Sequence, residues 1–372
     1  MIIKTEDFQS AAKTILLAVG VDRNAANVEI LAKGNTLALN VTNTEYYVRV
    51  NFETESAEDF RVVVDAALFL DLISGITTET FELNVTENGL EIKTGKSKYK
   101  IAKSAELTSL PVIKLENKTV EMNISEGILK SIMNVNGKEI LKAKTIDVDE
   151  LRKLYYITDS GCFTFVTGAC VNKFTLEKPV KMLLNDRIVK LFKLFKTDVY
   201  FSFGYDLEPD GKMSTKVTFE TENTYVAAKI NCDDKLLSNM DKYYSAAVGL
   251  GEQTYATHVV VSANALSSAI SRLMRFAKNS DSNTNMSSIL ATVKFEGDSM
   301  SIIDAVGNEE SVVFEDGSYI TESYPMMINI VDLKLVLDGC TDAHISLSSG
   351  NHRSVLVSYG TSYSLIPERS EK

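Results

Sequence analysis

A ten-residue segment, Arg187 to Lys196 (RIVKLFKLFK), places a basic residue at every third position between apolar residues. On a helix with about 3.6 residues per turn, the apolar residues Ile188, Leu191, Phe192 and Phe195 share one face. Lys190 and Lys193 lie on the opposite face, with Arg187 and Lys196 at its margins. Cations repeated along a packed helix can contact the phosphates of a nucleic acid. The alternative is a helix face exposed to solvent, on which the apolar stems of the lysines lie along the surface and their charged ends reach water.

The basic pattern recurs on other predicted helices. A segment beginning at Ser262 (SANALSSAISRLMRFAK) carries cations opposite its apolar residues, and two further amphipathic segments carry one each. The candidate DNA-binding residues are Lys13, Lys130, Arg187, Lys190, Lys193, Lys196, Arg272, Arg275 and Lys278. The last seven sum to +7 in a chain of net charge −11, so the other charged residues sum to −11 − 7 = −18. This segregation favours a local anion-binding surface over uniformly solvated faces.

The predicted contact is with phosphates, not with bases. No cluster of Asn or Gln accompanies the arginines, and neither helix-turn-helix nor zinc-finger spacing occurs. Binding of this kind does not depend on sequence and weakens with salt. Loose contact suits a protein that moves along a duplex.

The sequence predicts no catalytic, cofactor or metal site. It lacks phosphate-binding glycine loops, a nucleophile elbow and H-E-x-x-H. Its four cysteines form no C-x-x-C pair, and there are three histidines. With no apolar run of about 20 residues and no signal-peptide h-region, the chain is expected to be intracellular.

The elements that must position the cations form a repeated pattern. Amphipathic segments that begin near Lys4, Asn123 and Ser262 each follow a short β-like run and lead into alternating strands. A second strand–helix unit begins near Phe60, Val180 and Met326. This repetition predicts an α+β fold of three tandem, pseudo-symmetric domains, 1–115, 116–245 and 246–372, each with two helices packed on antiparallel sheets. The expected junctions are Leu107 to Pro111 and a polar linker from Cys232 to Gly251.

The three-fold arrangement resembles the bacterial-type DNA polymerase III β subunit, the sliding clamp, over the whole chain. Local matches are Gly95 to Ile101 (GKSKYKI), Leu110-Pro111, Val166-Thr167-Gly168 and Tyr363 to Pro367 (YSLIP). The resemblance implies a non-enzymatic processivity factor, in which two chains close head to tail into a homodimeric ring. Helices of the ring surround double-stranded DNA, so the chain is expected in the cytoplasm of a bacterium or a phage-infected host.

The resemblance also implies a pocket for short apolar peptides of DNA polymerase and the clamp loader. By motif position its residues are Thr167, Ala169, Cys170, Val171, Asn172, Leu365, Ile366 and Pro367, with Tyr243 and Tyr244 from the linker. The chain departs from the family here, because Val166 to Asn172 (VTGACVN) replaces the usual Ala-Thr-Asp-Gly-His-Arg-Leu, and Glu368 to Lys372 extends the tail. Such divergence suits a bacteriophage clamp with its own polymerase.

Two other functions compete with the clamp. An enzyme would need catalytic constellations, and the acidic pairs, such as Asp149 with Glu150, have no histidine or metal-ligand partners in the sequence. A structural or assembly protein built from repeated domains would need neither basic helix faces nor an apolar C-terminal groove. The clamp accounts for both features.

Overall fold

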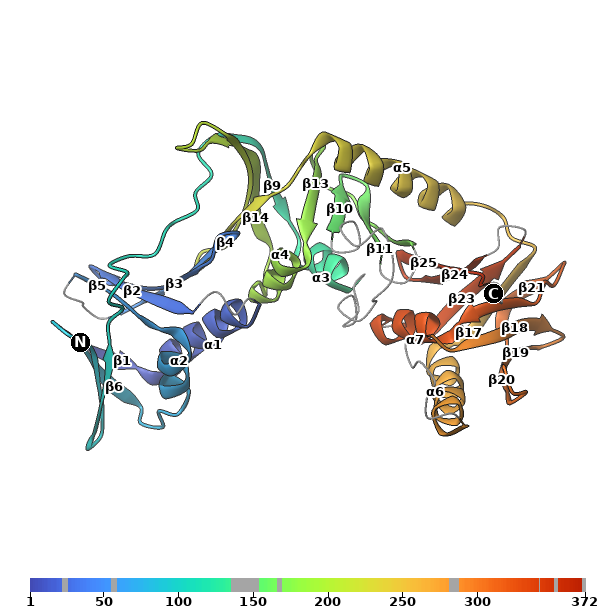
Figure 1. Ribbon diagram of the computed structural model, residues 1–372, viewed down its shortest axis with the longest axis horizontal. Helices are drawn as coiled ribbons and strands as arrows, with labels where there is room; N and C mark the ends of the chain where they lie inside the picture. The colour runs from blue at the N-terminus through green and yellow to red at the C-terminus, as the bar shows by residue number, and fades with distance from the viewer. Residues whose placement is uncertain are drawn as a thin grey trace. The chain divides into compact units, whose positions relative to one another are not determined.

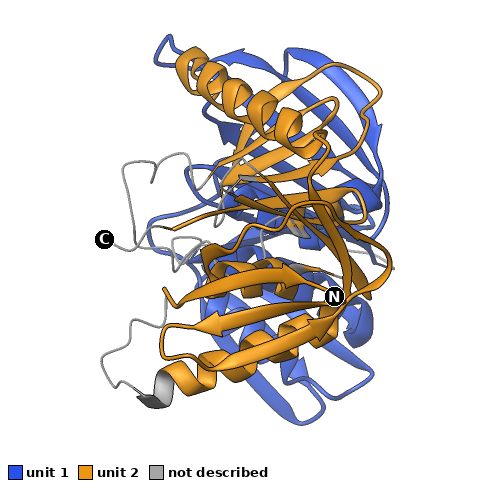
Figure 2. Ribbon diagram, turned by 90° about the vertical axis from the view of Figure 1, so that its right-hand side faces the viewer, with its two compact units in different colours: residues 1–130, 185–231 blue, residues 131–184, 232–372 orange. Residues whose placement is uncertain are grey.

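The computed structural model describes residues 1–21, 26–54, 59–134, 154–165, 169–280, 288–340, 342–350 and 354–369 (Figure 1). The chain divides into two compact units, each formed from separate stretches of sequence (Figure 2). Unit 1 contains residues 1–130 and 185–231, and unit 2 contains residues 131–184 and 232–372. The predicted domain boundaries at 115 and 245 remain a prediction, and residue 245 falls inside a helix.

Unit 1 is built on two antiparallel sheets. Its larger sheet has the order β5-β2-β3-β4-β16-β15-β14-β9, with strands Phe60–Asp65, Asn27–Lys33, Thr36–Thr42, Tyr46–Glu53, Thr224–Ile230, Met213–Glu220, Val199–Leu207 and Lys118–Ile124. Pairing of β4 with β16, from Tyr46 opposite Ala228 to Val50 opposite Thr224, joins strands that are distant in the sequence. The smaller sheet, β1-β6-β7-β8, contains Ile2–Lys4, Thr80–Thr86, Gly89–Thr94 and Ser97–Ala102.

The helices of unit 1 are held by apolar packing and side-chain caps. Helix α1 (Thr5–Val21) packs against α2 (Ala66–Ser74) and α4 (Asp186–Leu191). Phe8 of α1 is fully buried and meets Phe52, Phe69 and Phe81 edge-on. Asp65 caps α2 and Asn185 caps α4, each by accepting a hydrogen bond from a backbone amide in the first turn. These contacts fix one face of each helix and leave the other outward.

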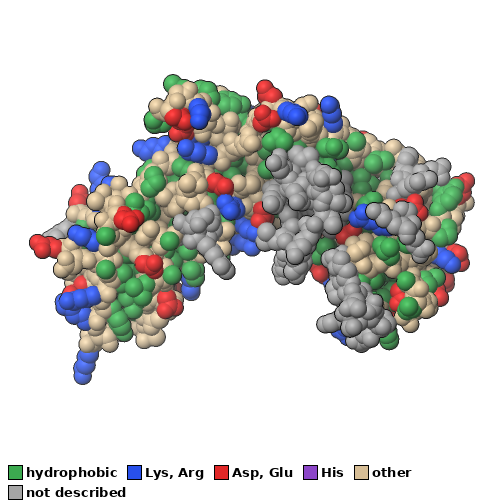
Figure 3. Space-filling view, viewed as in Figure 1, with side chains coloured by type: hydrophobic (Ala, Val, Ile, Leu, Met, Phe, Trp, Pro, Cys, Tyr) green, Lys and Arg blue, Asp and Glu red, His purple; other side chains and the backbone are tan. Residues whose placement is uncertain are grey.

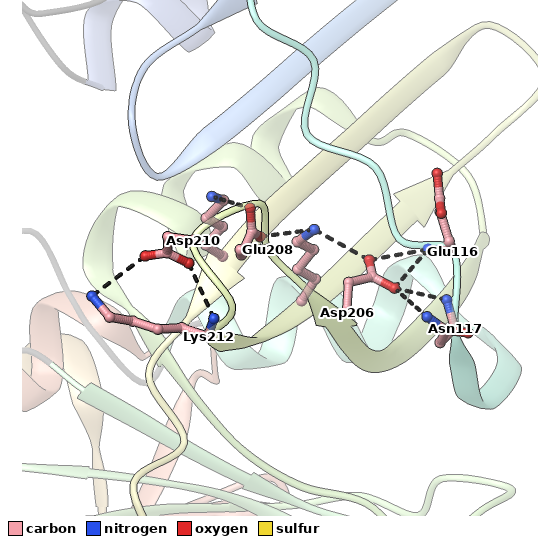
Figure 4. A network of polar contacts seen from close by, with 8 residues as sticks. Glu116, Asn117, Asp206, Glu208, Asp210 and Lys212 are labelled. Carbon is pink, nitrogen blue, oxygen red and sulfur yellow. Dashed lines mark hydrogen bonds and ion pairs between the residues drawn. The ribbon is translucent and has the colours of Figure 1, made fainter.

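A buried carboxylate anchors the segment 103–117 that follows β8. Asp206 of β14 accepts hydrogen bonds from the backbone amides of Glu116 and Asn117, at 3.1 and 2.9 Å (Figure 4). Lys216 Nζ lies 3.2 Å from the same carboxylate and 3.0 Å from Glu208. Asp206 and Lys216 are both buried, so this pair satisfies two charges that are expensive to desolvate.

The packing around this anchor leaves no room for larger side chains. A Cβ added at Gly204 would lie 2.0 Å from the carbonyl oxygen of Asn117. Farther along the segment, the amide of Leu110 donates to the buried carboxylate of Glu29. The segment is therefore fixed at two separate points on the large sheet of unit 1.

Unit 2 likewise has one larger and one smaller antiparallel sheet, and it has a helix between residues 234 and 251 in addition to the predicted ones. Its larger sheet has the order β13-β10-β11-β12-β25-β24-β23-β17-β21, with strands Lys181–Asn185, Leu154–Thr158, Gly161–Phe165, Ala169–Lys173, Ser362–Pro367, Ser354–Tyr359, His344–Ser349, Thr257–Ser262 and Glu315–Ile320. The smaller sheet, β20-β19-β18-β22, contains Glu309–Val313, Ser299–Asp304, Leu290–Glu296 and Met326–Asn329. Helix α6 (Ala263–Ser280) packs against α7 (Ile330–Gly339), β17 and β20.

All six predicted helix positions are confirmed, including α3 (Glu126–Asn134). The predicted linker from Cys232 to Gly251 is wrong, because the chain forms helix α5 (Asp234–Gly251) there. Asp233 caps α5 by accepting from the amides of Lys235 and Leu236. Its buried residues, Met240, Tyr244 and Ala247, recur at helical spacing. Packing of this face offsets the two glycines at the helix end.

The helix predicted from Arg187 to Lys196 is shorter than expected. The α-helix ends at Leu191, a 3₁₀ turn follows from Phe192 to Leu194, and Phe195 is extended. Leu194 and Phe195 are both buried at the end of this segment. Within the described ranges, no helix combines the length and apolar character needed to cross a bilayer.

Candidate nucleic-acid interface and partner pocket

The apolar face of α4 and its 3₁₀ turn packs into unit 1. Ile188, Leu191, Phe192 and Phe195 are each at most 3% exposed, as their spacing predicts. Phe192 meets Phe219 of β15 edge-on at 4.8 Å between ring centroids. Lys193 and Lys196 are exposed. The core therefore fixes where these two cations are presented.

Four candidate DNA-binding cations are paired with carboxylates. Lys130 lies 2.8 Å from Glu126, Arg187 lies 3.1 Å from Glu45, and Lys190 pairs with Asp186. Arg272 donates two hydrogen bonds of 2.7 Å to Glu310. This hydrogen bonding lowers the pKa of Glu310 and raises the pKa of Arg272, so both groups stay charged. The face in Figure 3 likewise has basic and acidic side chains interspersed.

Four other candidates, Lys13, Lys193, Lys196 and Arg275, are exposed and make no ion pair with any residue that the structure describes. Lys13 lies on α1 and Arg275 on α6. The side chain of Lys278 lies outside the described residues. These four cations need not exchange one partner for another before they contact an anion. They are the strongest candidates for phosphate contacts within each unit.

The paired cations give a direct prediction about affinity. Replacing Glu310 with glutamine removes the charged partner of Arg272, and we expect affinity for a short open-ended duplex to rise by up to about fivefold, since an exposed pair contributes about 0–1 kcal/mol. Fluorescence anisotropy at low salt measures the change. Glu296→Gln is the matched control, because Glu296 is exposed and has no ion pair among the described residues. Equal effects of both substitutions would assign the gain to net charge alone.

The predicted pocket residues lie mainly on two paired strands. β12 and β25 pair antiparallel, with Ala169 opposite Leu365 and Val171 opposite Tyr363. Val171, Tyr244 and Leu365 belong to one buried cluster, together with Tyr156, Phe163, Met240 and Ala247. Ile366 belongs to a different cluster, with residues of α6 and α7. The structure thus brings together only part of the predicted set.

The remaining pocket candidates have other surroundings. Cys170 contacts Ser364 at 3.1 Å between Sγ and Oγ, and Asn172 donates to the carbonyl of Ser131 at 2.9 Å. Both are buried, whereas Tyr243 is 48% exposed and stacks edge-on against Phe165. Pro367 ends β25 and is partly buried. Thr167 and the side chain of Ala169 lie outside the described residues.

Sequence reasoning missed the helix that covers this cluster. Met240, Tyr244 and Ala247 of α5 are buried against residues of β10, β11, β12 and β25. Their spacing of four and three residues was a helical signal within a stretch that otherwise looked polar. Tyr243 and Tyr244 are therefore helical residues of α5, Tyr244 buried in the cluster and Tyr243 at its exposed edge.

The described residues offer binding surfaces and no arranged reactive group. They contain no group of three or more His, Cys, Asp and Glu side chains that could hold a metal ion. Cys162 is buried, and burial raises the pKa of its thiol, so the reactive thiolate is disfavoured. The outward cations of α1, of the 3₁₀ turn and of α6 can form charge-assisted hydrogen bonds to phosphate oxygens.

Comparisons by family model, by sequence and by structure each find similarity to DNA polymerase III beta subunits or beta sliding clamps. Residues 7–111 match the family model described as DNA polymerase III beta subunit, N-terminal domain. The beta sliding clamp of Mycoplasmopsis pulmonis (strain UAB CTIP) is 24% identical over 152 residues, which are 37% of this chain and 36% of that protein. The match thus spans about a third of that relative's length.

Solved structures share the fold over the full chain. The DNA polymerase III beta chain of Streptococcus pneumoniae TIGR4 has a TM-score of 0.78 at 15% identity, covering 100% of this chain and 99% of its own. The DNA polymerase III subunit beta of Pseudomonas aeruginosa has a TM-score of 0.77 at 16% identity, covering 100% of both chains. The family-model match lies in the first third of the chain, and the likeness in fold covers its full length.

Proposed function

We propose that this chain, a divergent member of the DNA polymerase III β-subunit family, is a sliding clamp that encircles double-stranded DNA and acts as a processivity factor. The observation that carries the proposal is the full-length likeness in fold to DNA polymerase III β chains, at TM-scores of 0.77 and 0.78. The outward cations on α1, the 3₁₀ turn and α6 support it. The function is non-enzymatic, because a closed ring retains DNA by topology and needs no reaction.

The ring would close between two copies of the chain, head to tail. β8 is an edge strand of unit 1 and carries exposed Lys98, Tyr99 and Lys100. β20 is an edge strand of unit 2 and carries exposed Glu309 and Val313. Unpaired strand edges are templates for pairing with another chain. Opposite charges favour β8 of one copy against β20 of the other.

The grip on DNA would be weak and independent of sequence. Lys13, Lys193, Lys196 and Arg275 would contact phosphates directly, and the paired Lys130, Arg187, Lys190 and Arg272 would exchange carboxylates for phosphates at little cost. Lys278 completes the proposed set. Such contacts hold the duplex near the helices and still permit movement along it.

The proposed partners are double-stranded DNA, a DNA polymerase, a clamp loader and a second copy of the chain. The partner-peptide site would be centred on β12 and β25, as the family resemblance implies. The place of action would be the cytoplasm of a bacterium or of a phage-infected host. The departures around residues 166–172 favour a bacteriophage clamp with its own polymerase.

A threading experiment tests the proposal without a loader. A duplex is fixed to a bead at one end, the chain is added at low salt, and the free end is then capped with streptavidin. We expect a high-salt wash to remove the chain from uncapped DNA and leave it on capped DNA, because salt screens contacts but not topology. Cutting the capped duplex should release it.

The matched variant is Lys98→Glu with Lys100→Glu, on the edge strand β8. We expect its solution mass to fall from about two chains to one, with loss of retention on capped DNA, because like charges would meet at the joint. Retention that is equal on capped and uncapped DNA, or a wild-type chain that is a strict monomer at micromolar concentration, would contradict the ring.

A further inference from the structure

Helix α5 occupies the sheet surface where the partner pocket was expected. Met240 is fully buried, and Tyr244 and Ala247 are nearly so. They share one cluster with Val171 and Leu365, the pocket residues contributed by β12 and β25. The outward side of α5 carries exposed Lys242 and Ser245. An amphipathic helix laid in an apolar groove is a common mode of peptide recognition.

The fit of α5 to the sheet is close at its C-terminal end. A Cβ added at Gly251 would lie 2.4 Å from the ring of Tyr363, so only glycine allows this approach. Tyr363 donates to the carbonyl oxygen of Ala247 at 3.2 Å. Both contacts are made by Tyr363 of β25, which lies opposite Val171 in the β12–β25 pair.

Polar contacts tie the middle of α5 to β10 and β13. Tyr156 Oη donates to Asp241 at 2.6 Å, and Lys181 Nζ lies 3.0 Å from the same carboxylate. Ser160 and Tyr244 share a hydrogen bond of 3.1 Å between hydroxyls. These bonds fix the position of the helix along the groove, while the apolar residues supply most of the burial.

We propose that α5 is an intrachain occupant of the partner-peptide pocket. A short apolar segment of a partner protein would bind the surface of Val171 and Leu365 only when α5 leaves it, so the two compete. If α5 is undocked in about one molecule in a thousand, a partner's apparent affinity falls by about a thousandfold. The inference rests on the proposed function for the identity of the pocket, but docking of α5 is testable without DNA.

The test uses a fluorescent synthetic peptide of residues 234–251 as the probe. In the full-length chain, Met240→Lys with Ala247→Lys replaces two buried apolar residues of α5. Lysine has a good helix propensity, so the substitutions should leave the helix itself able to form. We expect the peptide to bind this variant at least about tenfold more tightly than the wild type, because a vacated groove raises the binding-competent fraction. A peptide that carries the same two substitutions should bind neither protein.

Controls separate docking from misfolding. Lys242→Ala, on the exposed side of α5, should behave as the wild type. Circular dichroism reports whether the double variant is folded, and a failure of the wild type to stay on capped DNA would count against the clamp, not against α5. If the double variant fails to fold, Met240→Ala serves in its place with a smaller gain. Equal binding to wild type and folded variant, or no binding to the folded variant, would overturn the proposal.

Discussion

Replacing Lys193, Lys196 and Arg275 with glutamate is expected to weaken binding to a short open-ended duplex at low salt by a hundredfold or more. Each lost phosphate contact lowers the slope of log affinity against log salt by about 0.9, and a dimer loses each contact twice. The three side chains are exposed and have no ion pair among the described residues, so the substitutions break no internal ion pair there. A salt titration followed by fluorescence anisotropy measures both the affinity and the slope.

The matched control reverses three other exposed lysines. Lys212 lies on the β14–β15 hairpin, and Lys235 and Lys242 lie on α5, outside the proposed DNA-contact set. The triple control changes net charge by the same amount, and we expect its salt slope to stay near that of the wild type. An equal loss in both triple variants would mean that net charge, not the basic helix faces, governs binding.

Replacing Asp206 with alanine is expected to lower the free energy of unfolding by about 3–5 kcal/mol, the usual cost of removing one partner of a buried ion pair. Lys216, which is 7% exposed, would keep its charge with Glu208 as its one remaining carboxylate partner, at 3.0 Å. The amides of Glu116 and Asn117 would lose their acceptor as well. Denaturant unfolding monitored by circular dichroism measures the change.

The control for Asp206 lies four residues farther along the same hairpin. Asp210 pairs with Lys212 at 3.4 Å, and their side chains are 58% and 83% exposed. We expect Asp210→Ala to change the free energy of unfolding by less than about 0.5 kcal/mol, as is usual at the surface. If the two variants are equally stable, the buried network contributes nothing beyond a surface pair.

The carboxylate of Asp206 makes the stability of the fold depend on pH in a known direction. Burial raises the pKa of Asp206, but hydrogen bonds from Asn117, Glu116 and Lys216 outweigh it, so the pKa is lowered. A group whose pKa is lower in the folded state stabilises the fold above its unfolded pKa of about 3.9, and this contribution is lost as pH falls through the folded pKa. The fall in stability below about pH 4 should therefore be smaller in Asp206→Ala than in the wild type.

Sequence periodicity was sufficient for elements whose burial depends on local spacing. The helices at α1, α4 and α6 follow from their apolar faces. Gly34 and Gly297 have the positive φ that tight turns between strands require. Helix α5 was missed because its burial depends on strands far away in the sequence. Its local composition, with Gly249 and Gly251, resembled a linker.

The pairing of Arg187 and of Arg272 was not predictable from the sequence. Glu45 lies 142 residues from Arg187, and Glu310 lies 38 residues from Arg272. Only the tertiary fold places these two carboxylates beside the helices, whereas the pairs of Lys130 with Glu126 and of Lys190 with Asp186 follow the i,i+4 spacing of a helix. The residues that the family resemblance assigned to a pocket lie mainly on the paired strands β12 and β25, and the resemblance did not predict helix α5 against them.

The pairing of β4 with β16 has a mechanical consequence. Five consecutive residue pairs, from Tyr46 with Ala228 to Val50 with Thr224, make one continuous sheet from strands of the first and second predicted domains. Bending the chain at that place would break several backbone hydrogen bonds at once, so this sheet is stiff there. In a ring of two such chains, the joints between molecules would open more readily than this sheet of unit 1. Opening to admit DNA is therefore expected to separate one β8–β20 joint and to leave the sheets within each chain intact.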